Sequence, residues 1–320
     1  MTARLAEYVR RFAKLRTDTS QQRWTARTYY RAPHKPLLLL AVMAQFEGGL
    51  IRDNQVRPTP ELAQDFLLQW ASVLEPSPAA SFVLPFFHLR SEGFWHLVAT
   101  AGNEKLVEST RQIRNATQLA DLVHHAALDP ELFELLLNAE ARAILASTLI
   151  ETYFVSPLQS TLREQILITA QASQYSQQLL TQNQPQGGDI LIKARSQGFR
   201  RAVVQAYDRR CAFCGVRLIT HNGCVVVDAA HIIPWSSAKN DELRNGLSLC
   251  KLCHWTFDIG FISVSEKYIL LGSPQLRSPH NLPAQILSLT SRPILRPENE
   301  AHWPDTRALA WHYANKFMKV

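Results

Sequence analysis

The sequence has no apolar run long enough to cross a bilayer. Its longest such run, Leu37 to Ala44, falls far short of the roughly 20 residues that a membrane helix needs. The first residues, Met1 to Glu7, lack the apolar stretch and the small-residue cleavage site of a secretory signal peptide. Charged residues make up 19% of the chain and apolar residues 46%, which excludes a disordered composition. These absences predict a folded cytoplasmic protein without a membrane partner.

Cysteine is scarce and confined to one stretch of the chain. All five cysteines lie between positions 211 and 253, and four of them form two Cys-x-x-Cys pairs, Cys211 with Cys214 and Cys250 with Cys253. Disulfides are rare in the reducing cytoplasm, whereas two such pairs suit one tetrahedral zinc ion. We therefore expect a structural zinc, Zn²⁺, at these four residues and a spare buried thiol at Cys224.

Acidic residues are too few to balance the basic ones, and the imbalance is local. The formal net charge is +7, and the stretch from Ile190 to His254 holds ten Lys or Arg against four Asp or Glu, which leaves +6 there. A concentrated basic field attracts polyanions and speeds their capture. Charge alone leaves two interpretations open, a nucleic-acid partner and a merely soluble basic surface.

The length of 320 residues allows two domains, because one domain typically takes roughly 100–200 residues. The segment 181–189 is polar and holds a proline and a pair of glycines, so it cannot build a core. We predict domains over residues 1–180 and 190–320, joined by a linker over 181–189.

Hydrophobic periodicity and capping signals predict a mixture of helices and strands. Strands are expected over 82–89 and 94–98, joined across a turn at 91–93. Residues 119–149 are expected to form two helices that part at Asp129-Pro130. Trp303 and Trp311 are expected in the core of a C-terminal cover. Further helices are expected over 1–20, 37–46, 59–73, 161–180, 190–207 and 306–318.

The gap between the two cysteine pairs holds three more elements in a recognisable order. The β-rich run Val225-Val-Val-Asp-Ala-Ala-His-Ile-Ile-Pro-Trp235 is followed by Asn245-Gly-Leu and then by Cys253-His-Trp-Thr-Phe-Asp258. Together with the cysteines, this order resembles the HNH, or ββα-metal, endonuclease family over roughly residues 195–275. One histidine alone would more often be a partly buried structural residue, and Asn-Gly alone a turn.

Hydrolysis of a phosphodiester needs a base that activates water and a cation that stabilises charge on the phosphate and the leaving oxygen. Neutral imidazole suits the base because its pKa lies at about 6.5. The resemblance implies that His231 is the general base, that His254 binds a catalytic Mg²⁺ or Mn²⁺ ion, and that Asn245 holds the loop or the metal. Asp258 lies four residues after His254 on the same helix face, so it is a candidate further ligand.

One position departs from the family pattern. Many HNH sites have a metal-binding Asp or His immediately before the base, where this sequence has Ala230. Asp228 lies three residues before His231, so strand alternation points it to the other face unless a bulge brings it round to the metal. His254, which follows Cys253, is alternatively a zinc ligand.

Two stretches of the N-terminal half carry a second resemblance. Arg31-Ala-Pro-His-Lys-Pro-Leu-Leu-Leu-Leu40 and Leu84-Pro-Phe-Phe-His-Leu-Arg90, the latter followed by Gly93-Phe-Trp95, resemble the sulfur-binding domain of McrA-type restriction endonucleases. The similarity covers roughly residues 10–155. That family recognises DNA with a phosphorothioate backbone and cuts nearby with an HNH domain.

A phosphorothioate sulfur is larger and less hydrated than oxygen, so an apolar cup rimmed by cations can prefer it. The resemblance implies a cup at Pro85, and contacts to phosphates or base edges from Arg31, His34, Lys35, His88 and Arg90.

The family pairs His with Arg and Tyr with Pro, where this sequence has His34-Lys35 and Leu84-Pro85. Lys lacks the planar fork of Arg, and Leu lacks the aromatic ring. The alternative interpretation is that Pro-His-Lys-Pro only begins a helix and that Phe86, Phe87 and Trp95 fill a core.

These observations predict an α+β protein with an N-terminal mixed helical and β DNA-reading domain and a C-terminal ββα-metal HNH domain on a four-cysteine zinc frame. The predicted function is a phosphorothioate-sensing restriction endonuclease that acts on double-stranded DNA. Two alternatives remain: an HNH nuclease that reads another modification or plain sequence, and a non-catalytic zinc protein that binds DNA. A homodimer is a further hypothesis, since cutting both strands from a single site often requires two protomers.

Overall fold

The structure is a computed structural model that describes residues 2–75, 77, 80–182, 190–278, 280 and 284–319. Most of the expected linker, 183–189, lies outside the described residues. The chain divides into two compact units. Unit 1 comprises Met1–Ser173 and Ile219–Cys224, and unit 2 comprises Gln174–Leu218 and Val225–Val320. The expected α+β class is confirmed, because helices predominate and the strands pair in three small two-stranded sheets.

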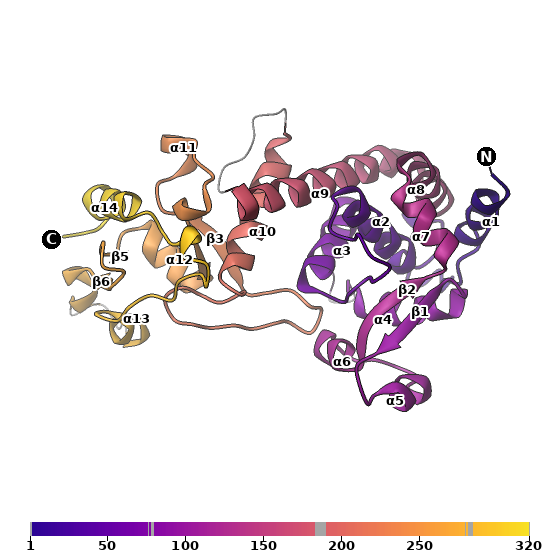
Figure 1. The fold of residues 1–320 in the computed structure, drawn as a ribbon, viewed down its shortest axis with the longest axis horizontal. Helices are drawn as coiled ribbons and strands as arrows, with labels where there is room; N and C mark the ends of the chain where they lie inside the picture. Colours follow the sequence, from indigo (N-terminus) through magenta and orange to yellow (C-terminus); the bar gives the residue numbers. More distant parts are fainter. Residues whose placement is uncertain are drawn as a thin grey trace. The chain divides into compact units, whose positions relative to one another are not determined.

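Unit 1 is a helical assembly around one central helix, α2 (His34–Glu47), and also holds a two-stranded sheet (Figure 1). Helix α2 is apolar on every side, as expected for 37–46, and is therefore buried against its neighbours. The other elements are α1 (Ala3–Phe12), α3 (Pro60–Val73), α4 (Val83–His88), β1 (Trp95–Ala99), α5 (Glu104–Ser109), α6 (Ala116–Leu122), β2 (Val123–Leu128), α7 (Pro130–Leu137), α8 (Ala139–Tyr153) and α9 (Ser156–Gln182), which runs past the division at Ser173.

Local signals in unit 1 explain where several helices begin and end. Thr59 caps α3 by accepting a hydrogen bond from the backbone N–H of Leu62, and Pro60 occupies the first helical position. The helix expected over 1–20 ends early, at Phe12. The helices expected over 59–73 and 161–180 are confirmed by α3 and α9.

One strand prediction and one helix prediction in unit 1 need correction. Residues 82–89 form helix α4 and the start of a 3₁₀ helix, Leu89–Glu92, instead of a strand. Phe82, Val83, Phe86 and Phe87 are all buried, and this spacing of three and four places them on one helical face despite their high β propensity.

Residues 119–149 are expected to form two helices that part at Asp129-Pro130; a helix, α7, does begin at Pro130, but strand β2 precedes it. This strand pairs antiparallel with β1, with Trp95 opposite Leu128, and Ala126 also bridges Val56. Its residues, Val-His-His-Ala-Ala-Leu, have mixed propensities, so pairing with a distant strand decides the conformation.

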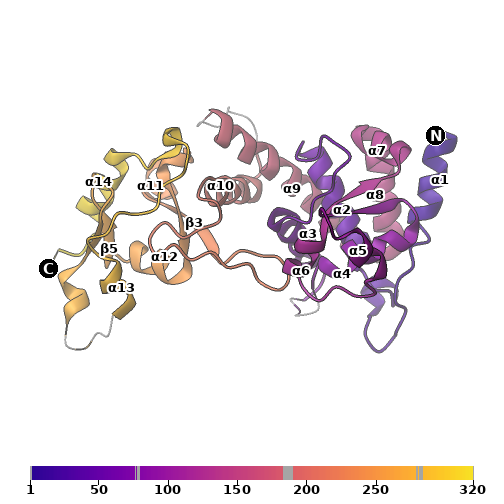
Figure 2. The same ribbon diagram turned by 60° about the horizontal axis from the view of Figure 1, so that its bottom comes forward.

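Unit 2 is built on two antiparallel strands followed by a helix. Strand β3 (Val227–His231) pairs with β4 (Gly246–Cys250), with His231 opposite Gly246, and α12 (Lys251–Asp258) follows β4 directly. Figure 2 shows α12 beside β3, and the two are in contact. The remaining elements are α10 (Ile192–Ala206), α11 (Trp235–Ala238), the 3₁₀ helix η3 (Leu243–Asn245), β5 (Ile262–Val264), β6 (Leu270–Gly272), α13 (Ala284–Leu289) and α14 (Thr306–Asn315).

In the C-terminal cover, a histidine, His312, is buried in the core, and the two tryptophans expected there are not. Trp303 and Trp311 are half-buried, whereas His312 is buried and its ring stacks on Phe257 at 3.7 Å with an interplanar angle of 4°. Burial, aided by the charge of Lys316 and opposed by a bond to the Phe257 carbonyl, lowers the pKa of His312 to about 4. The expected tryptophan core is thus corrected to a core centred on neutral His312.

Among the described residues, no helix combines the length and the apolar character that crossing a bilayer requires.

Candidate functional site

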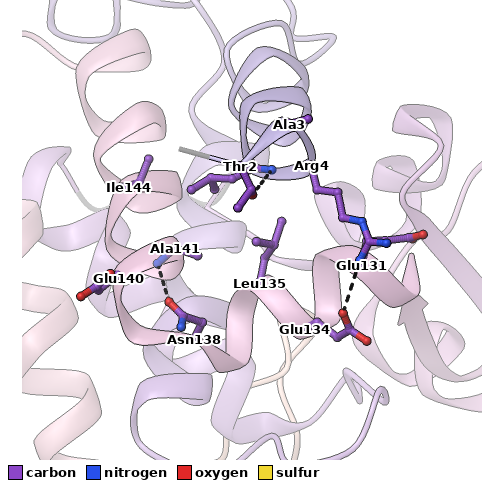
Figure 3. Close-up of a pocket in the computed structure, with 11 residues that line it drawn as sticks. Thr2, Ala3, Arg4, Glu131, Glu134, Leu135, Asn138, Glu140, Ala141 and Ile144 are labelled. Atoms are coloured by element: carbon purple, nitrogen blue, oxygen red, sulfur yellow. Dashed lines mark hydrogen bonds and ion pairs between the residues drawn. The ribbon is translucent and has the colours of Figure 1, made fainter.

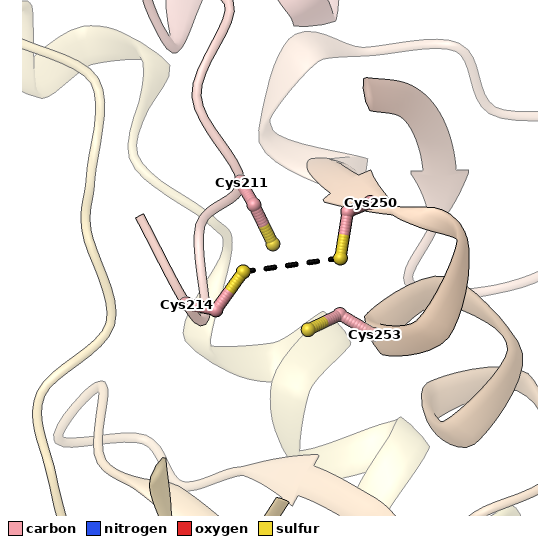
Figure 4. Close-up of side chains that lie close together, drawn as sticks. All are labelled: Cys211, Cys214, Cys250 and Cys253. Atoms are coloured by element: carbon pink, nitrogen blue, oxygen red, sulfur yellow. Dashed lines mark hydrogen bonds between the residues drawn. The ribbon is translucent and has the colours of Figure 1, made fainter. Parts of the chain in front are cut away.

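The two Cys-x-x-Cys pairs converge in unit 2 (Figure 4). Cys211 and Cys214 lie in the turn after α10, Cys250 ends β4, and Cys253 lies in the first turn of α12. The four sulfur atoms all lie within 4.8 Å of one another. A hydrogen bond from the N–H of Gly215 to the carbonyl of Cys211 closes the first turn, where Gly215 has a φ of +73° that favours glycine.

The spacing of these sulfur atoms fits a tetrahedral metal ion such as zinc. With Zn–S bonds of about 2.3 Å, two sulfur atoms at the corners of a tetrahedron are about 3.8 Å apart. Cys214 Sγ and Cys250 Sγ are 3.8 Å apart. The fifth cysteine, Cys224, belongs to the segment of unit 1 and is half-buried, not fully buried as expected.

A cavity of about 320 Å³ in unit 2 brings two of the expected histidines together. His231, at the end of β3, and His254, on α12, both line it. The strand–strand–helix fold therefore brings together two histidines that are 23 positions apart in the sequence. Asp258 also lines the cavity, and its Oδ2 lies 3.4 Å from Nε2 of His254. Other lining residues are Ala229, Ile232, Pro234, Trp235, His312 and Lys316.

The ring of His231 is held on both its face and its edge. It stacks on Phe199 of α10 at 3.9 Å and 8°, and its Nε2 lies 2.8 Å from Oδ1 of Asp241. Gly246, opposite His231 in the ladder, leaves room for this packing, because a Cβ there would come within 2.5 Å of Val203 and 3.1 Å of Phe199.

Asp241 is a functional candidate that sequence reasoning missed. Its side chain is 3% exposed and accepts hydrogen bonds from His231, from the hydroxyl of Tyr175 at 2.9 Å and from the guanidinium of Arg195. Burial alone would raise the pKa of this carboxyl, but the three hydrogen bonds and the charge of Arg195 hold the pKa below its ordinary value. The sequence offered no signal beyond an acidic residue in the loop between His231 and Asn245.

Asn245 is placed where its contacts support the loop, the first of its two expected roles. Its Oδ1 accepts from the N–H of Ile233, and its Nδ2 donates to the carbonyls of Ile233 and Asn240. The side chain is 2% exposed and does not line the cavity.

Asp228 is not brought to the cavity. The ladder from Val227 to His231 is regular, so no bulge turns this side chain round, and its exposed carboxylate pairs with Arg200 at 2.7 Å. The residue that faces the cavity beside His231 is Ala229, while Ala230 is buried. Neither alanine supplies a metal ligand.

A separate cavity of about 540 Å³ in unit 1 gathers four of the expected DNA contacts. His34 and Lys35 come from the start of α2, and Pro85 and His88 from α4. Leu84, which stands where the family has Tyr, also lines it, and the other lining residues are Arg16, Thr17, Asp18, Arg23, Trp24, Ala32, Trp70 and Ser77.

The remaining two expected contacts lie outside this cavity. The guanidinium of Arg90 stacks over Phe87 at 3.9 Å and donates to the carbonyls of Val107 and Thr110. The guanidinium of Arg31 lies 5.7 Å from the ring of Tyr153. These contacts give Arg90 a structural role in unit 1.

Aromatic rings form one wall of the unit 1 cavity. The ring of His34 lies between Trp24, at 5.3 Å, and Trp70, at 4.8 Å. The indole N–H of Trp24 donates to Asp18 at 2.9 Å. No short-range pattern links Trp24 to Trp70, so only the fold reveals the wall.

Two of the basic side chains at this cavity carry little net positive charge into it, because one is paired with a carboxylate and the other has a lowered pKa. Lys35 is almost buried, and its ammonium forms an ion pair with buried Glu92. Burial lowers the pKa of His88, and the positive charges of Lys35 and Arg90 lower it further. Pro85 is buried, while Leu84 is 40% exposed.

A further cavity of unit 1, of about 800 Å³, lies between α1, α7 and α8 (Figure 3). Arg4 and Glu134 form an exposed ion pair at 3.9 Å along it. None of the residues expected from the sequence to bind DNA or metal lines it.

Comparison with known proteins gives two family matches. Residues 211–265 match the family model described as HNH endonuclease, and residues 6–171 match the model described as ScoMcrA-like, DNA sulfur-binding domain. Both resemblances expected from the motifs are therefore confirmed.

One solved structure, titled "Modification dependent TagI restriction endonuclease", matches at 19% identity with a TM-score of 0.29. The match covers 36% of this chain and 36% of that chain, so the chain spans little more than a third of that endonuclease, and the likeness is too weak to support a conclusion. No match was found among curated proteins. Because the sulfur-binding model covers more than half of the sequence, the protein belongs to the ScoMcrA-like DNA sulfur-binding family and joins that domain to an HNH endonuclease domain.

Proposed function

We propose that the protein is a restriction endonuclease that senses phosphorothioate DNA through unit 1 and hydrolyses double-stranded DNA through unit 2. The observation that carries the nuclease assignment is the shared cavity of His231, His254 and Asp258 next in sequence to a four-cysteine metal frame. DNA is the partner implied by both family matches. A cytoplasmic location, where the DNA lies, and a homodimer that cuts both strands belong to the same proposal.

His231 acts as the general base in this proposal, because it faces the cavity and is held by Phe199 and Asp241. His254 and Asp258 hold the catalytic Mg²⁺ or Mn²⁺ ion, since their ligand atoms, 3.4 Å apart, are close enough to share an ion with bonds of about 2.0–2.2 Å. Such an ion, when bound, stabilises negative charge on the phosphate and the leaving oxygen. Asn245 keeps the loop after β3 in place.

Positive charge around the cavity suits a phosphate substrate. Lys316 lines it, and Trp235, which also lines it, carries the ammonium of Lys239 at 3.8 Å over its ring. These cations attract the DNA backbone regardless of sequence. Zinc at the four cysteines serves as a structural ion that holds the turn after α10 to the start of α12.

Sulfur recognition is assigned to the unit 1 cavity. The buried ring of Pro85 and the indole of Trp70 supply apolar surface, and Arg16 and Arg23 supply the cationic rim. Because Lys35 is paired with Glu92, the cavity favours a weakly hydrated atom over a strongly hydrated oxygen.

Cleavage of matched plasmids with and without phosphorothioate, in Mg²⁺ and in Mn²⁺, tests both assignments. Wild type is expected to cut only the sulfur-bearing plasmid, and His231→Ala to lose about 10²–10⁴-fold in rate, as loss of a general base does. His280→Ala, an exposed histidine of the same unit, is the matched control and keeps the wild-type rate. Pro85→Ala is expected to lower the preference for sulfur, with exposed Pro130→Ala as its control.

A second candidate function follows from Ala229 and Ala230, which leave the cavity with few metal ligands. A protein that binds DNA without cutting it would bind both plasmids and cleave neither in any divalent ion. Cutting of both plasmids would support the nuclease assignment and contradict sulfur recognition. The protein would then be an HNH nuclease that reads another modification or plain sequence.

A further inference from the structure

We propose that Asp241 is the positioning residue that selects the tautomer of His231 and directs its Nδ1 to the attacking water. The inference rests on the proposed function, in which His231 is the base. It starts from the 2.8 Å hydrogen bond between His231 Nε2 and Asp241 Oδ1. All four side chains of this network, from Tyr175, Arg195, His231 and Asp241, belong to unit 2.

An ionised carboxylate can only accept hydrogen bonds, so its partner nitrogen must carry the proton. Neutral imidazole carries one ring proton, and a proton on Nε2 leaves the lone pair on Nδ1. Asp241 therefore determines which nitrogen of His231 can remove a proton from water.

The contacts around Asp241 keep it in the accepting form. The side chain is 3% exposed, and an isolated carboxyl in such a place would favour its neutral form. Tyr175 and Arg195 donate to Oδ2, on the side away from His231, and so favour the anion. The geometry thus assigns Oδ1 to His231 and Oδ2 to the two supporting donors.

The other contacts of the His231 ring do not select its tautomer, so this choice depends on the Asp241 carboxylate. Phe199 stacks on the imidazole at 8°, which fixes the plane of the ring but not the position of its proton. Among the described residues, no other carboxylate is in hydrogen-bond or ion-pair contact with His231. The same arrangement, with a buried Asp on the far nitrogen of a catalytic His, works in serine proteases through orientation and choice of tautomer.

Asp241→Asn is the sharpest variant, because its amide keeps the shape while its Nδ2 can donate to Nε2 and thereby favour the wrong tautomer. The cleavage rate is expected to fall on the order of 10²–10⁴-fold, by no more than for His231→Ala; the corresponding change in a serine protease costs about 10⁴-fold. The dissociation constant for DNA, measured without divalent ions, is expected to stay within about 3-fold. Asp208→Asn is the matched control, since this carboxylate is exposed and Asn tolerates the left-handed backbone at φ +50°.

The double variant His231→Ala/Asp241→Asn separates positioning from a purely structural effect. If Asp241 acts through His231, the second substitution adds no further loss of rate. Additive losses, or a rate for Asp241→Asn within 10-fold of wild type while His231→Ala is inactive, would overturn the inference and leave the proposed function intact. An active His231→Ala enzyme would instead overturn the assignment of the base.

Nitrogen NMR of the wild-type protein tests the tautomer even if Asp241→Asn does not fold. The His231 signals are identified by their absence in His231→Ala. At neutral pH the neutral ring is expected to show a protonated Nε2 and an unprotonated Nδ1. The opposite tautomer would overturn the inference.

Discussion

The two proposed sites of this protein differ in how their residues are distributed along the chain. In unit 2, the proposed base and metal ligands lie between His231 and Asp258, within one strand–strand–helix element, and only His312 and Lys316 of the cavity lining lie further along the chain. In unit 1, the cavity proposed to recognise sulfur, called the reader cavity here, takes its proposed contacts from Arg16 and Arg23 before α2, from Trp70 of α3 and from Pro85 of α4. A site within one local element leaves a motif in the sequence, whereas a site assembled from distant segments leaves only fragments.

The two cavities also differ in electrostatics. In unit 2, Lys316 lines the cavity, and the ammonium of Lys239 lies 3.8 Å over the ring of Trp235, which also lines it. In the reader cavity the ammonium of Lys35 is paired with Glu92, and the lowered pKa of His88 keeps that imidazole neutral at physiological pH. This contrast fits the proposal that unit 2 binds a charged phosphate and unit 1 a soft, poorly hydrated sulfur.

The largest expected effect is on the metal frame, which only unit 2 has among the described residues. Cys211→Ser is expected to abolish zinc binding and cleavage, because structural zinc in peptides contributes about 10–16 kcal/mol of binding energy that is coupled to folding. Metal analysis and thermal melting measure the loss. Cys224→Ser is the matched control and should keep one zinc per chain, since Cys224 lies outside the cluster. Equal zinc loss in both variants would contradict the assignment.

The next effect is expected in unit 1, at the ion pair of Lys35 and Glu92. Lys35→Met leaves a buried carboxylate without its cation, so the unfolding free energy of unit 1 should fall by about 3–5 kcal/mol. Denaturant unfolding measures it. The double change Lys35→Met/Glu92→Leu removes both charges and should recover most of the loss. If Lys35→Met lowers the unfolding free energy only slightly, the ion pair contributes little to stability, and Lys35 is then available to contact DNA.

The smallest effect concerns acid sensitivity, which should differ between the units because of His312. Its pKa is lowered to about 4 in the folded state, against about 6.5 when unfolded. The unfolded state therefore binds more protons between these values, and stability is lost as the pH falls from about 6.5 to 4, by about 3 kcal/mol.

Unfolding curves at pH 7 and pH 4 for wild type and His312→Gln measure this difference. Gln does not titrate, so the variant should lack the loss of about 3 kcal/mol that His312 causes in the wild type between pH 6.5 and pH 4. Parallel losses in the two proteins would show that other groups, such as the buried Asp241, govern acid sensitivity.

Much of the nuclease unit could be predicted because its chemistry and its geometry coincide locally. The Cys-x-x-Cys pairs and the order of His231, Asn245 and His254 sufficed to place a metal frame and a ββα unit. The same reasoning missed Asp241, because a loop acid acquires meaning only when Tyr175 and Arg195, far away in sequence, converge on it.

In unit 1 the prediction failed where propensity and packing disagree. Phe82 to Leu89 has the composition of a strand, yet its burial follows the helical period of α4. Val123 to Leu128 has no strong preference, and pairing with β1 makes it a strand. Hydrogen-bonded pairing with a distant segment outweighs intrinsic preferences that amount to less than about 1 kcal/mol per residue.

The sequence by itself determined the family, the metal frame and the pair of histidines, because each depends on residue types at short, regular spacings. Only the tertiary structure decided that Asn245 serves the loop, that Asp228 and Arg90 lie away from the cavities, and that Asp241 and Trp70 belong beside them. These outcomes depend on long-range packing, in which a side chain's role is set by which distant groups satisfy its hydrogen bonds and its burial.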